Sequence, residues 1–323
     1  MCRRIVFAFL VALALLFPGA VRALSPAPAP VITLVGDAAM TVNAAFAFED
    51  PGATARDSSG QDLTDRITVE GEVIPYLVGE YVLTYAVADE HGAKAQAQRT
   101  VTVVPVALPQ VVQPPKKTIY LTFDDGPGPS TEKLLDILKQ YDVKATFFVV
   151  GNQGRKELIR RAYEEGHSIG VHSYTHRFEE IYVDEAAFFA DFLATEAVIL
   201  EQTGQYTPLF RFPGGSGNTV SCGNRGLMTR LTGIMEDMGY RYFDWNVNSL
   251  DASHTDLTSL DFFNVIRNRI TANGDGFSIV LQHDTKSNSV FAVEDLIRWG
   301  LENGYTFLPL DITSPTVHAA LNN

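Results

Sequence analysis

Seven short apolar runs alternate with six stretches of helical periodicity in the part of the chain that follows residue 117. The helical stretches begin near Ser130, Arg155, Asp184, Asn224, Asp256 and Ser289, and the apolar runs cover 118–124, 145–151, 168–173, 209–214, 242–247, 278–283 and 306–310. Regular alternation of strands and helices over about 195 residues predicts an α/β fold built on a parallel sheet or a (β/α) barrel. Enzymes of this architecture carry their chemistry at the carboxyl ends of the strands.

Between residues 31 and 104 the pattern predicts strands alone. The segment "EYVLTYAVA" (80–88) alternates larger and smaller side chains, "QRTVTVV" (98–104) alternates valine with threonine, and "DEHG" lies between them as a turn, which predicts a hairpin. Earlier short runs are separated by turns rich in Gly and Asp, as a β-sandwich requires. We therefore expect a small all-β sandwich over 31–104, a Pro-rich linker over 105–116 and the α/β domain over 117–315.

The first 23 residues have the features of a signal peptide. A short basic start, "MCRR", precedes a 13-residue apolar core, and small residues end the segment, with Val21 and Ala23 at the −3 and −1 positions. A membrane span needs roughly 20 apolar residues, and Pro18 interrupts this run too early, although a retained anchor is the alternative. We expect a secreted or cell-wall-associated protein with no stable membrane insertion after cleavage. Cleavage would leave Cys222 as a single cysteine, so a metal site would have to use His, Asp and Glu.

The net charge of −13 narrows the range of partners. A nucleic-acid surface needs a basic footprint, so no nucleic-acid partner is expected. Simple electrostatic attraction to anionic lipid is disfavoured for the same reason. A neutral or cationic polymer fits this charge better.

Reactive side chains gather where the predicted strands end. Two adjacent aspartates end the first strand, two histidines follow the third, an arginine ends the fourth and a histidine ends the sixth: Asp124, Asp125, His172, His176, Arg211 and His283. Parallel strands share one edge at their carboxyl ends, so these side chains are expected to lie close together. The aspartate pair alone could also be a surface turn ahead of Gly126.

The segment "HSYTH" supplies the strongest local sign of a metal site. On a helical turn, His172 and His176 would face the same side and could hold one ion. Two histidines and one carboxylate, with positions open for water and substrate, form a catalytic rather than a structural set. One divalent ion is expected; two nitrogens and one oxygen suit Zn²⁺ best, and Co²⁺ or Ni²⁺ could replace it. Taken alone, the histidine pair could simply lie on the surface of a helix.

The order of the motifs resembles that of a known family. "TFDDGP", "HSYTH", "RFPGG", "DWNVNSLDA" and "LQH" follow one another between Lys117 and Leu310, as in the polysaccharide deacetylases of carbohydrate esterase family four, the NodB homology domain. The resemblance implies a distorted (β/α) barrel that hydrolyses N-acetyl groups of aminosugars, or acetyl esters in some members. Residues 31–104 resemble the immunoglobulin-like modules of secreted bacterial proteins, particularly in "EDPGATARD" and "VGEYVLTYAVADEHGAKA".

The resemblance also implies a role for each site residue. Asp124 would be the catalytic base, Arg211 its ion-pair partner, His283 the general acid and the Gly214 N–H an oxyanion donor. The metal ligands would be Asp125, His172 and His176, and the substrate-binding residues would be Pro213, Trp245 and Leu281.

Other interpretations of single residues remain open. Arg211 could be only a structural ion-pair partner, and His283 a satisfied histidine at a strand end. His167 precedes a strand and is expected to be structural. His254 and His318 have no partner motif and are expected at the surface.

Two positions depart from the pattern commonly seen in the family. Asn248 stands where a carboxylate that supports the general acid is expected, and Ala252 stands where a tryptophan is expected. This predicts a lower pKa for His283 than a carboxylate partner would give, although Asp244 or Asp251 could supply the missing charge. Gly214 stands where an aromatic residue is frequent, which predicts a more open groove beside the loop 214–226.

The expected substrate is an acetylated polysaccharide. Peptidoglycan is favoured, chitin-type oligomers come next, and release of acetate is the expected reaction. The alternatives are an acetylxylan-type O-acetyl esterase and a wall-binding protein whose catalysis is impaired. A further alternative is an adhesin in which residues 31–104 bind the wall.

Overall fold

The computed structural model describes residues 28–45 and 48–322. The signal peptide predicted over 1–23 lies outside the described residues. Among the described helices, none combines the length and the apolar character needed to span a membrane. The chain divides into two compact units: one contains the described residues up to Ala38 with Pro51–Glu70 and Leu83–Arg99, and the other contains Ala39–Asp50, Gly71–Val82 and the residues from Thr100 onward.

Strands are the only regular elements, apart from one short 3-10 turn, among the described residues between Val31 and Val104, as predicted. Leu83, Tyr85 and Val87 alternate with more exposed neighbours, because successive side chains of a strand face opposite sides of the sheet. One sheet pairs β1 (Val31–Leu34) with β3 (Ala53–Arg56), and the second has the order β2 (Ala39–Asn43), β6 (Lys94–Val104), β5 (Gly79–Ala88), β4 (Thr68–Glu70), with η1 (Thr64–Arg66) before β4.

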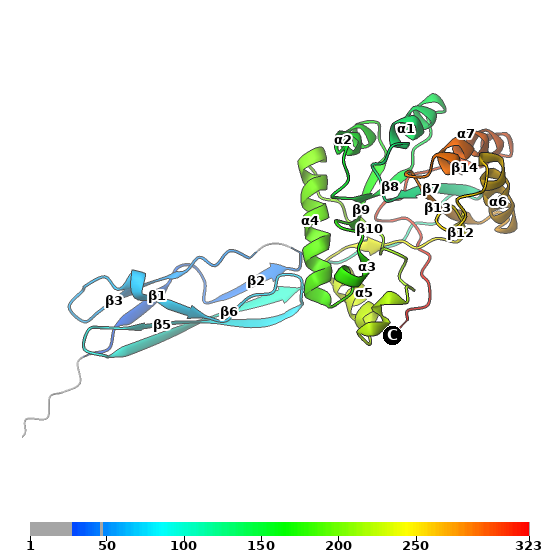
Figure 1. Cartoon of the computed structure of the whole chain (residues 1–323). Coiled ribbons are helices and arrows are strands. Elements are labelled where there is room, and N and C mark those ends of the chain that lie inside the picture. Colours follow the sequence, from blue (N-terminus) through cyan, green and yellow to red (C-terminus); the bar gives the residue numbers. More distant parts are fainter. Residues whose placement is uncertain (1–27, 46–47, 323) are drawn as a thin grey trace, which may run out of the picture. The chain divides into compact units, whose positions relative to one another are not determined.

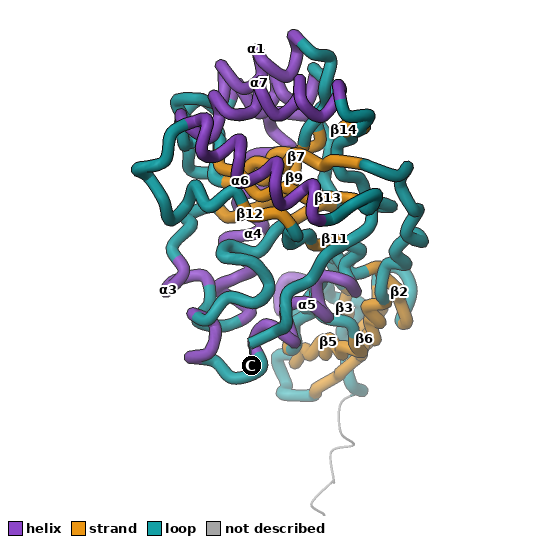
Figure 2. The backbone as a smooth tube through the Cα atoms, turned by 90° about the vertical axis from the view of Figure 1, so that its right-hand side faces the viewer, coloured by secondary structure: helices purple, strands orange, loops and turns teal. Residues whose placement is uncertain are grey.

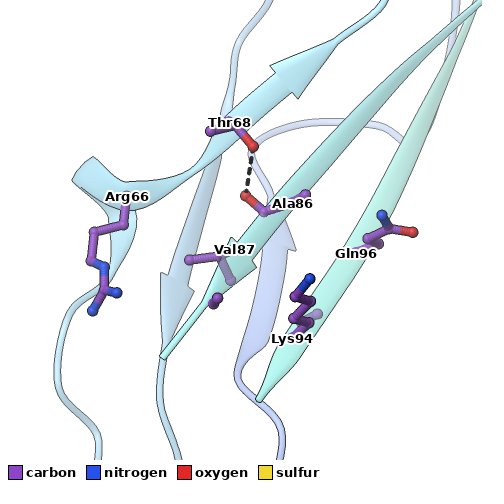
Figure 3. A pocket seen from close by; sticks show the side chains of 8 residues that line it. Arg66, Thr68, Ala86, Val87, Lys94 and Gln96 are labelled. Carbon is purple, nitrogen blue, oxygen red and sulfur yellow. Dashed lines mark hydrogen bonds between the residues drawn. The ribbon is translucent and has the colours of Figure 1, made fainter. Parts of the chain in front are cut away.

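A shallow cavity of about 610 Å³ lies against this second sheet. In Figure 3, Thr68 donates a hydrogen bond to the Ala86 carbonyl at one side of the cavity, and its Oγ1 lies 3.3 Å from that oxygen. The described lining has two cations and no carboxylate or histidine: Arg66, Thr68, Ala86, Val87, Ala88, Lys94, Ala95 and Gln96. The described lining therefore lacks the carboxylate and histidine side chains that most often serve as general acids and bases.

Parallel strands form a curved sheet in the second part of the chain (Figure 1). Its order is β11 (Arg241–Tyr242), β10 (Leu209–Phe210), β9 (Ser168–Ser173), β8 (Thr146–Val150), β7 (Thr118–Asp124), β13 (Phe277–His283) and β12 (Val247–Asn248), and β14 (Thr306–Phe307) also pairs with β7. Among the described strands, no ladder joins β11 to β12. The sheet is therefore an incomplete barrel, which confirms the predicted distorted (β/α) architecture.

Helices cover the outside of the curved sheet, as Figure 2 shows for the helices around β7, β9 and β13. Helices α1 and α7 pack together, α6 packs on α7, and α4 packs on β9. Their bounds are α1 (Thr131–Gln140), α2 (Glu157–Glu164), α3 (Phe178–Ile181), α4 (Glu185–Thr203), α5 (Leu227–Asp237), α6 (Ser259–Ala272) and α7 (Ser287–Glu302), and η2 (Val220–Gly223) is a 3-10 turn.

The apolar run at 242–247, expected to be one strand, is split into β11 and β12. The interruption arises because the side chain of Asn246 replaces part of the ladder: its Oδ1 accepts from the Ile279 N–H at 2.7 Å, and its Nδ2 donates to the Phe277 carbonyl at 3.1 Å. Asp244, also in this interval, is buried and accepts hydrogen bonds from a neighbouring loop. Polar side chains thus interrupt the strand between β11 and β12.

The innermost strand, β7, is buried along its whole length. Strands of parallel sheets covered on both faces show such continuous apolar runs rather than alternation. On one outer face, Phe188 and Phe192 of α4 pack against Phe210 of β10 and Phe212 just after it, with ring centroids 5.5–6.4 Å apart. Phe189 packs edge-on against Phe188 at 5.4 Å. Burial of such rings fixes the position of the residues that follow β10.

Candidate active site and metal centre

The carboxyl ends of four strands bring the predicted reactive side chains together. Asp124 and His283 end the neighbouring strands β7 and β13 and are directly paired in register. His172 lies near the end of β9, and Arg211 follows β10 directly. Adjacent parallel strands thus present their polar ends at one edge of the sheet, the position at which such folds bind ligands.

Asp125, His172 and His176 form a candidate metal centre. Oδ1 of Asp125 lies 3.5 Å from Nε2 of His172 and 3.2 Å from Nε2 of His176, and one donor atom from each residue lies within 4.8 Å of the others. Asp125 Oδ1 is buried and makes no hydrogen bond. Burying a carboxylate oxygen without a hydrogen bond is costly. A divalent cation among these two nitrogens and one oxygen would remove that cost, so the residues fit such an ion.

The two histidines do not lie on one helical turn, and that expectation was wrong. His172 belongs to β9, whereas His176 lies in the loop before α3 with φ +56°. Asp125 is also left-handed, with φ +73°. Such backbone is uncommon for residues other than glycine and persists where the surroundings hold it in place. Two of the three candidate ligands are therefore presented by constrained loops.

Asp191 of α4 holds the loop that carries His176. Its Oδ2 accepts from the Ser173 hydroxyl at 2.6 Å and the Tyr174 N–H at 2.7 Å. Its Oδ1 accepts from the N–H and the hydroxyl of Thr175, both at 2.8 Å. The Ser173 hydroxyl oxygen in turn accepts from the His176 N–H at 2.9 Å. The half-buried carboxylate of Asp191 thus replaces the hydrogen bonds that a helical turn would have supplied.

The orientation of His172 is set from outside the candidate metal centre. Its Nδ1 lies 2.8 Å from the Arg211 carbonyl oxygen. Because a carbonyl oxygen only accepts, Nδ1 carries a hydrogen and Nε2 is the atom that faces Asp125. Metal-binding histidines are commonly fixed by such a bond at the other ring nitrogen.

Ionisation in this cluster depends on the carboxylates and histidines together. Burial disfavours charge on His172, but Asp124 and Asp125 outweigh this effect and raise the pKa of His172. Burial and the neighbouring His172 lower the pKa of His176. Burial opposes the ionised form of Asp125, but the histidines outweigh it and lower the pKa of that carboxyl. Protons and a cation would compete for these groups, so cation binding is expected to weaken at low pH.

Asp124 and Arg211 form the predicted ion pair. Nη1 of Arg211 donates to Asp124 Oδ1 at 2.8 Å and to the Thr122 hydroxyl at 2.7 Å. The Arg211 side chain is 0% exposed, and its guanidinium lies 4.3 Å from the centre of the Phe148 ring. Further donors of Arg211 bond the carbonyls of Phe243 and Asp244 at 2.8 and 3.2 Å. The arginine therefore orients Asp124 through Oδ1. The other oxygen, Oδ2, is not bonded by Arg211 and lies 3.8 Å from His172 Nε2.

His283 is supported by Asp251, and the expectation based on Asn248 was wrong. Nδ1 of His283 donates to Asp251 Oδ1 at 2.7 Å, and its backbone N–H donates to Oδ2 at 2.9 Å. Burial disfavours charge on His283, but the bond and charge of Asp251 outweigh it and raise the pKa of His283 to about 9. Asn248 instead accepts from the Leu250 N–H at 2.8 Å. The sequence left Asp244 and Asp251 as candidates for the carboxylate that supports His283, and Asp251 is that carboxylate.

Asp244, the other aspartate, holds the glycine-rich loop. Its Oδ1 accepts from the Ser216 N–H at 2.9 Å, and its Oδ2 accepts from the Ser216 hydroxyl and, at 2.8 Å, from the Ala319 N–H. The loop begins with Gly214 and Gly215, which both have left-handed backbone, with φ of +76° and +81°. A carboxylate that binds three donors thus fixes a turn that only glycine adopts without strain.

The three predicted substrate-binding residues differ in exposure. Pro213 is buried, and its carbonyl accepts from the Tyr182 hydroxyl at 2.8 Å. Leu281 is 5% exposed in β13, and Trp245 is half-buried against Gly215. The expected opening beside Gly214 is filled in part by Phe178, because a β-carbon added to Gly214 would lie 3.0 Å from Cε2 of that ring.

The histidines outside the cluster lie as expected. His167 is buried, and its Nδ1 accepts from the Ala145 N–H at 3.1 Å. Burial lowers the pKa of His167 to about 4, so this residue is neutral and structural. His254 is exposed, and the exposed His318 stacks on Tyr242 with ring centroids 3.9 Å apart.

Two supporting acids were missed from the sequence. Asp191 is an isolated carboxylate in the apolar segment "AAFFADFLA", and that contrast was a usable signal. Asp284 follows His283, is 1% exposed and accepts from the Thr131 hydroxyl at 2.5 Å. Burial raises the pKa of Asp284 to about 7. A β-carbon on Gly126 would collide with this carboxyl, so Asp284 packs directly on the turn that follows Asp125.

Comparison with known proteins places the chain in a family. A family model described as polysaccharide deacetylase matches residues 111–242. A peptidoglycan-N-acetylglucosamine deacetylase of Bacillus cereus is 33% identical over 195 residues, which cover 59% of this chain and 68% of the relative. The chain belongs to the polysaccharide deacetylase family. A second member, a putative polysaccharide deacetylase of Bacillus subtilis, is 32% identical over 62% of this chain and 70% of its own length.

A solved structure supports the same assignment. The catalytic domain of a peptidoglycan N-acetylglucosamine deacetylase from Eubacterium rectale is 43% identical with a TM-score of 0.65, and the match covers 67% of this chain and 99% of that domain. A family model described as the Ig-like domain of bacterial surface proteins matches residues 32–103. This polysaccharide deacetylase therefore carries an immunoglobulin-like β-sandwich before its α/β barrel, as predicted.

Proposed function

We propose that this chain is a secreted or wall-associated, metal-dependent deacetylase that hydrolyses N-acetyl groups of a cell-wall aminosugar polymer and releases acetate. The observation that carries the proposal is the buried Oδ1 of Asp125, which makes no hydrogen bond and lies 3.2–3.5 Å from Nε2 of His176 and His172. Two further pairs, Asp124–Arg211 and His283–Asp251, border these residues. A candidate base and a candidate acid thus accompany a candidate metal centre.

Asp125, His172 and His176 would hold one divalent cation, for which Zn²⁺ suits the donor set best. Such a cation lowers the pKa of water and polarises an amide carbonyl. Asp125 would bind such a cation through Oδ1, and the Arg211 carbonyl keeps the His172 ring in position through Nδ1. The chain therefore supplies ligands whose geometry is fixed before the substrate binds.

Asp124 would accept the proton of the attacking water. Its Oδ1 is engaged by Arg211, so Oδ2, which lies 3.8 Å from His172 Nε2, is the oxygen left for this proton. The bond from Arg211 holds this carboxylate in one orientation, as a positioned general base requires. The new carbon–oxygen bond forms as this proton leaves the water.

His283 would donate a proton to the departing amine. Its Nδ1 is engaged by Asp251, so Nε2 is the donating atom, 4.0 Å from Asp125 Oδ2. The raised pKa keeps the imidazole protonated at neutral pH. Protonation lets the carbon–nitrogen bond break, so acetate and the free amine form instead of the starting amide. The Gly214 N–H would stabilise the oxyanion that precedes this step.

Peptidoglycan is the proposed substrate. The relatives from Bacillus cereus and Eubacterium rectale are named for deacetylation of its N-acetylglucosamine. The immunoglobulin-like match to bacterial surface proteins supports a location outside the cell or at the wall. Pro213, Trp245 and Leu281 are proposed to line the sugar site. Asn248 no longer favours the alternative of a wall-binding protein with impaired catalysis, because Asp251 supplies the charge that Asn248 lacks.

Acetate release from three substrates tests the proposal. The purified chain, loaded with Zn²⁺, is expected to release acetate from peptidoglycan and, more slowly, from chitin oligomers. Asp124→Asn should lose this activity while its bound metal stays constant. Release from acetylated xylan but from neither aminosugar polymer would contradict N-deacetylation and select the O-acetyl esterase.

A further inference from the structure

Two aromatic rings occupy the places where side chains of Gly214 and Gly215 would lie. A β-carbon on Gly214 would be 3.0 Å from Cε2 and 3.3 Å from Cζ of Phe178. A β-carbon on Gly215 would be 3.0 Å from Cη2 of Trp245. These distances are shorter than ordinary carbon contacts. The glycine turn that presents the Gly214 N–H is therefore in close contact with a ring at each of its two residues.

Phe178 links this turn to the candidate metal centre. It lies two positions after His176, and its ring meets the imidazole edge-on, with centroids 5.1 Å apart at 65°. It also meets Tyr182 edge-on at 6.1 Å, and the Tyr182 hydroxyl bonds the Pro213 carbonyl. Such edge-to-face contacts hold a ring in one orientation. The position of Phe178 is therefore fixed from both sides.

The Phe178 ring is only half-buried, unlike the phenylalanines of α4 that fill the core beside it. Part of this residue therefore remains accessible, and the residue lies against Gly214 and His176, where the acetyl group would be placed. A pyranose ring presents faces of C–H groups that pack on aromatic side chains, while its polar groups remain at the rim. A fixed, accessible ring at this point matches the apolar face of a sugar.

We propose that Phe178 is a specificity-determining residue that packs on the sugar carrying the N-acetyl group to be hydrolysed. This inference rests on the proposed deacetylase function. The ring would bind a part of the substrate that does not react, and this binding would orient the amide above the candidate metal centre. An acetyl substrate without a sugar would gain nothing from Phe178, whereas an aminosugar polymer would.

Substitution of Phe178 by leucine separates sugar packing from mere support of the glycine turn. Leucine keeps apolar volume against Gly214 but removes the aromatic face. Phe178→Leu is expected to raise KM for a tetramer of N-acetylglucosamine about tenfold, while kcat/KM for p-nitrophenyl acetate stays within about twofold. Phe178→Tyr should restore the KM for the tetramer. Tyr206→Leu, at a tyrosine that is 68% exposed before β10, is the matched control and should change neither value.

Binding of the same tetramer, measured by calorimetry in the Asp124→Asn background with Zn²⁺ bound, keeps this test independent of turnover. Weaker binding in Phe178→Leu supports the inference, even if the wild-type chain releases no acetate and the proposed function fails. Equal loss of activity on the tetramer and on p-nitrophenyl acetate would overturn it, because Phe178 would then only brace the turn. Unchanged tetramer binding and KM would overturn it as well.

Discussion

The two charged pairs beside the candidate metal centre differ in the charge of the supporting group, which is a guanidinium in one and a carboxylate in the other. Arg211 bonds Oδ1 of Asp124 through Nη1 and so fixes the orientation of that carboxylate. Asp251 bonds Nδ1 of His283, and this carboxylate raises the pKa of the imidazole. The candidate base thus has an oriented carboxylate, and the candidate acid has a raised pKa.

The pH dependence of the reaction tests the His283–Asp251 pair. His283 must be protonated to act as an acid, and its pKa is raised to about 9, so activity should fall as pH rises through that region. In Asp251→Asn the main raising influence is lost while burial remains, so the alkaline limb of the kcat/KM profile should move to lower pH. The stability that charged His283 contributes is complete below its ordinary pKa of 6.5 and is lost as pH rises through about 9.

Asn248→Asp is the matched control for this pH profile, because Asn248 bonds Leu250 and not the imidazole. Its alkaline limb should coincide with that of the wild-type chain. A limb that stays in place in Asp251→Asn, or that moves in Asn248→Asp, would contradict the assigned pairing.

Loss of Arg211 should destabilise the fold. Arg211→Ala leaves the Asp124 carboxylate buried without its partner, and breaking such a pair costs about 3–5 kcal/mol in the free energy of unfolding. Urea denaturation of the metal-free protein measures this loss. The double variant Arg211→Ala with Asp124→Asn should recover part of it. A double variant as unstable as Arg211→Ala would show that the loss arises from packing rather than from the unpaired charge.

At the scale of elements, the fold could be predicted further than the loops of the site. Alternation of apolar runs with helical periodicity is local, so the strands and helices after residue 117 were predictable, and the helices begin close to the expected residues. The four-residue spacing of His172 and His176 suits a helical turn and a tight loop equally. The loop is selected by Asp191, which is distant in sequence, and no local pattern contains that information.

The same limit explains the error over His283. Asn248 and Asp251 lie within one short segment, and the sequence alone does not say which of them faces the imidazole. The backbone after β12 decides this: Asn248 accepts from Leu250, and Asp251 then lies in position to accept both His283 donors. Leu250 has φ +72° at the turn. Left-handed backbone at a leucine is held by tertiary contacts rather than favoured by residue type, so the sequence does not predict it.

The loop held by Asp191 should control cation affinity. Asp191→Ala removes the acceptor for four donors next to His176, so the affinity for Zn²⁺ should fall by about 10- to 100-fold, as for other groups that orient metal ligands. Competition with a coloured chelator measures it. Asp184→Ala, which removes the N-cap of the same helix, is the control and should affect stability but not affinity. Equal affinities in Asp191→Ala and wild type would contradict this role.

At the scale of the whole molecule, the family assignment and the geometry of the site support each other. The match to polysaccharide deacetylases covers the strands that present Asp124, Asp125 and the two histidines, and His283 lies on the strand paired with β7. The fold class was predictable because five motifs occur in order along the chain. The contacts of Phe178 with Gly214 were not predictable, because they join loops that follow different strands.

Metal dependence is the central claim, and metal content measured together with acetate release tests it most directly. Wild-type protein is expected to bind one divalent cation, to lose acetate release from peptidoglycan when that cation is removed by a chelator, and to regain it with Zn²⁺. Asp125→Ala should fail to bind the cation and should release no acetate under any of these conditions. Full acetate release from cation-free protein, or from Asp125→Ala, would contradict the account.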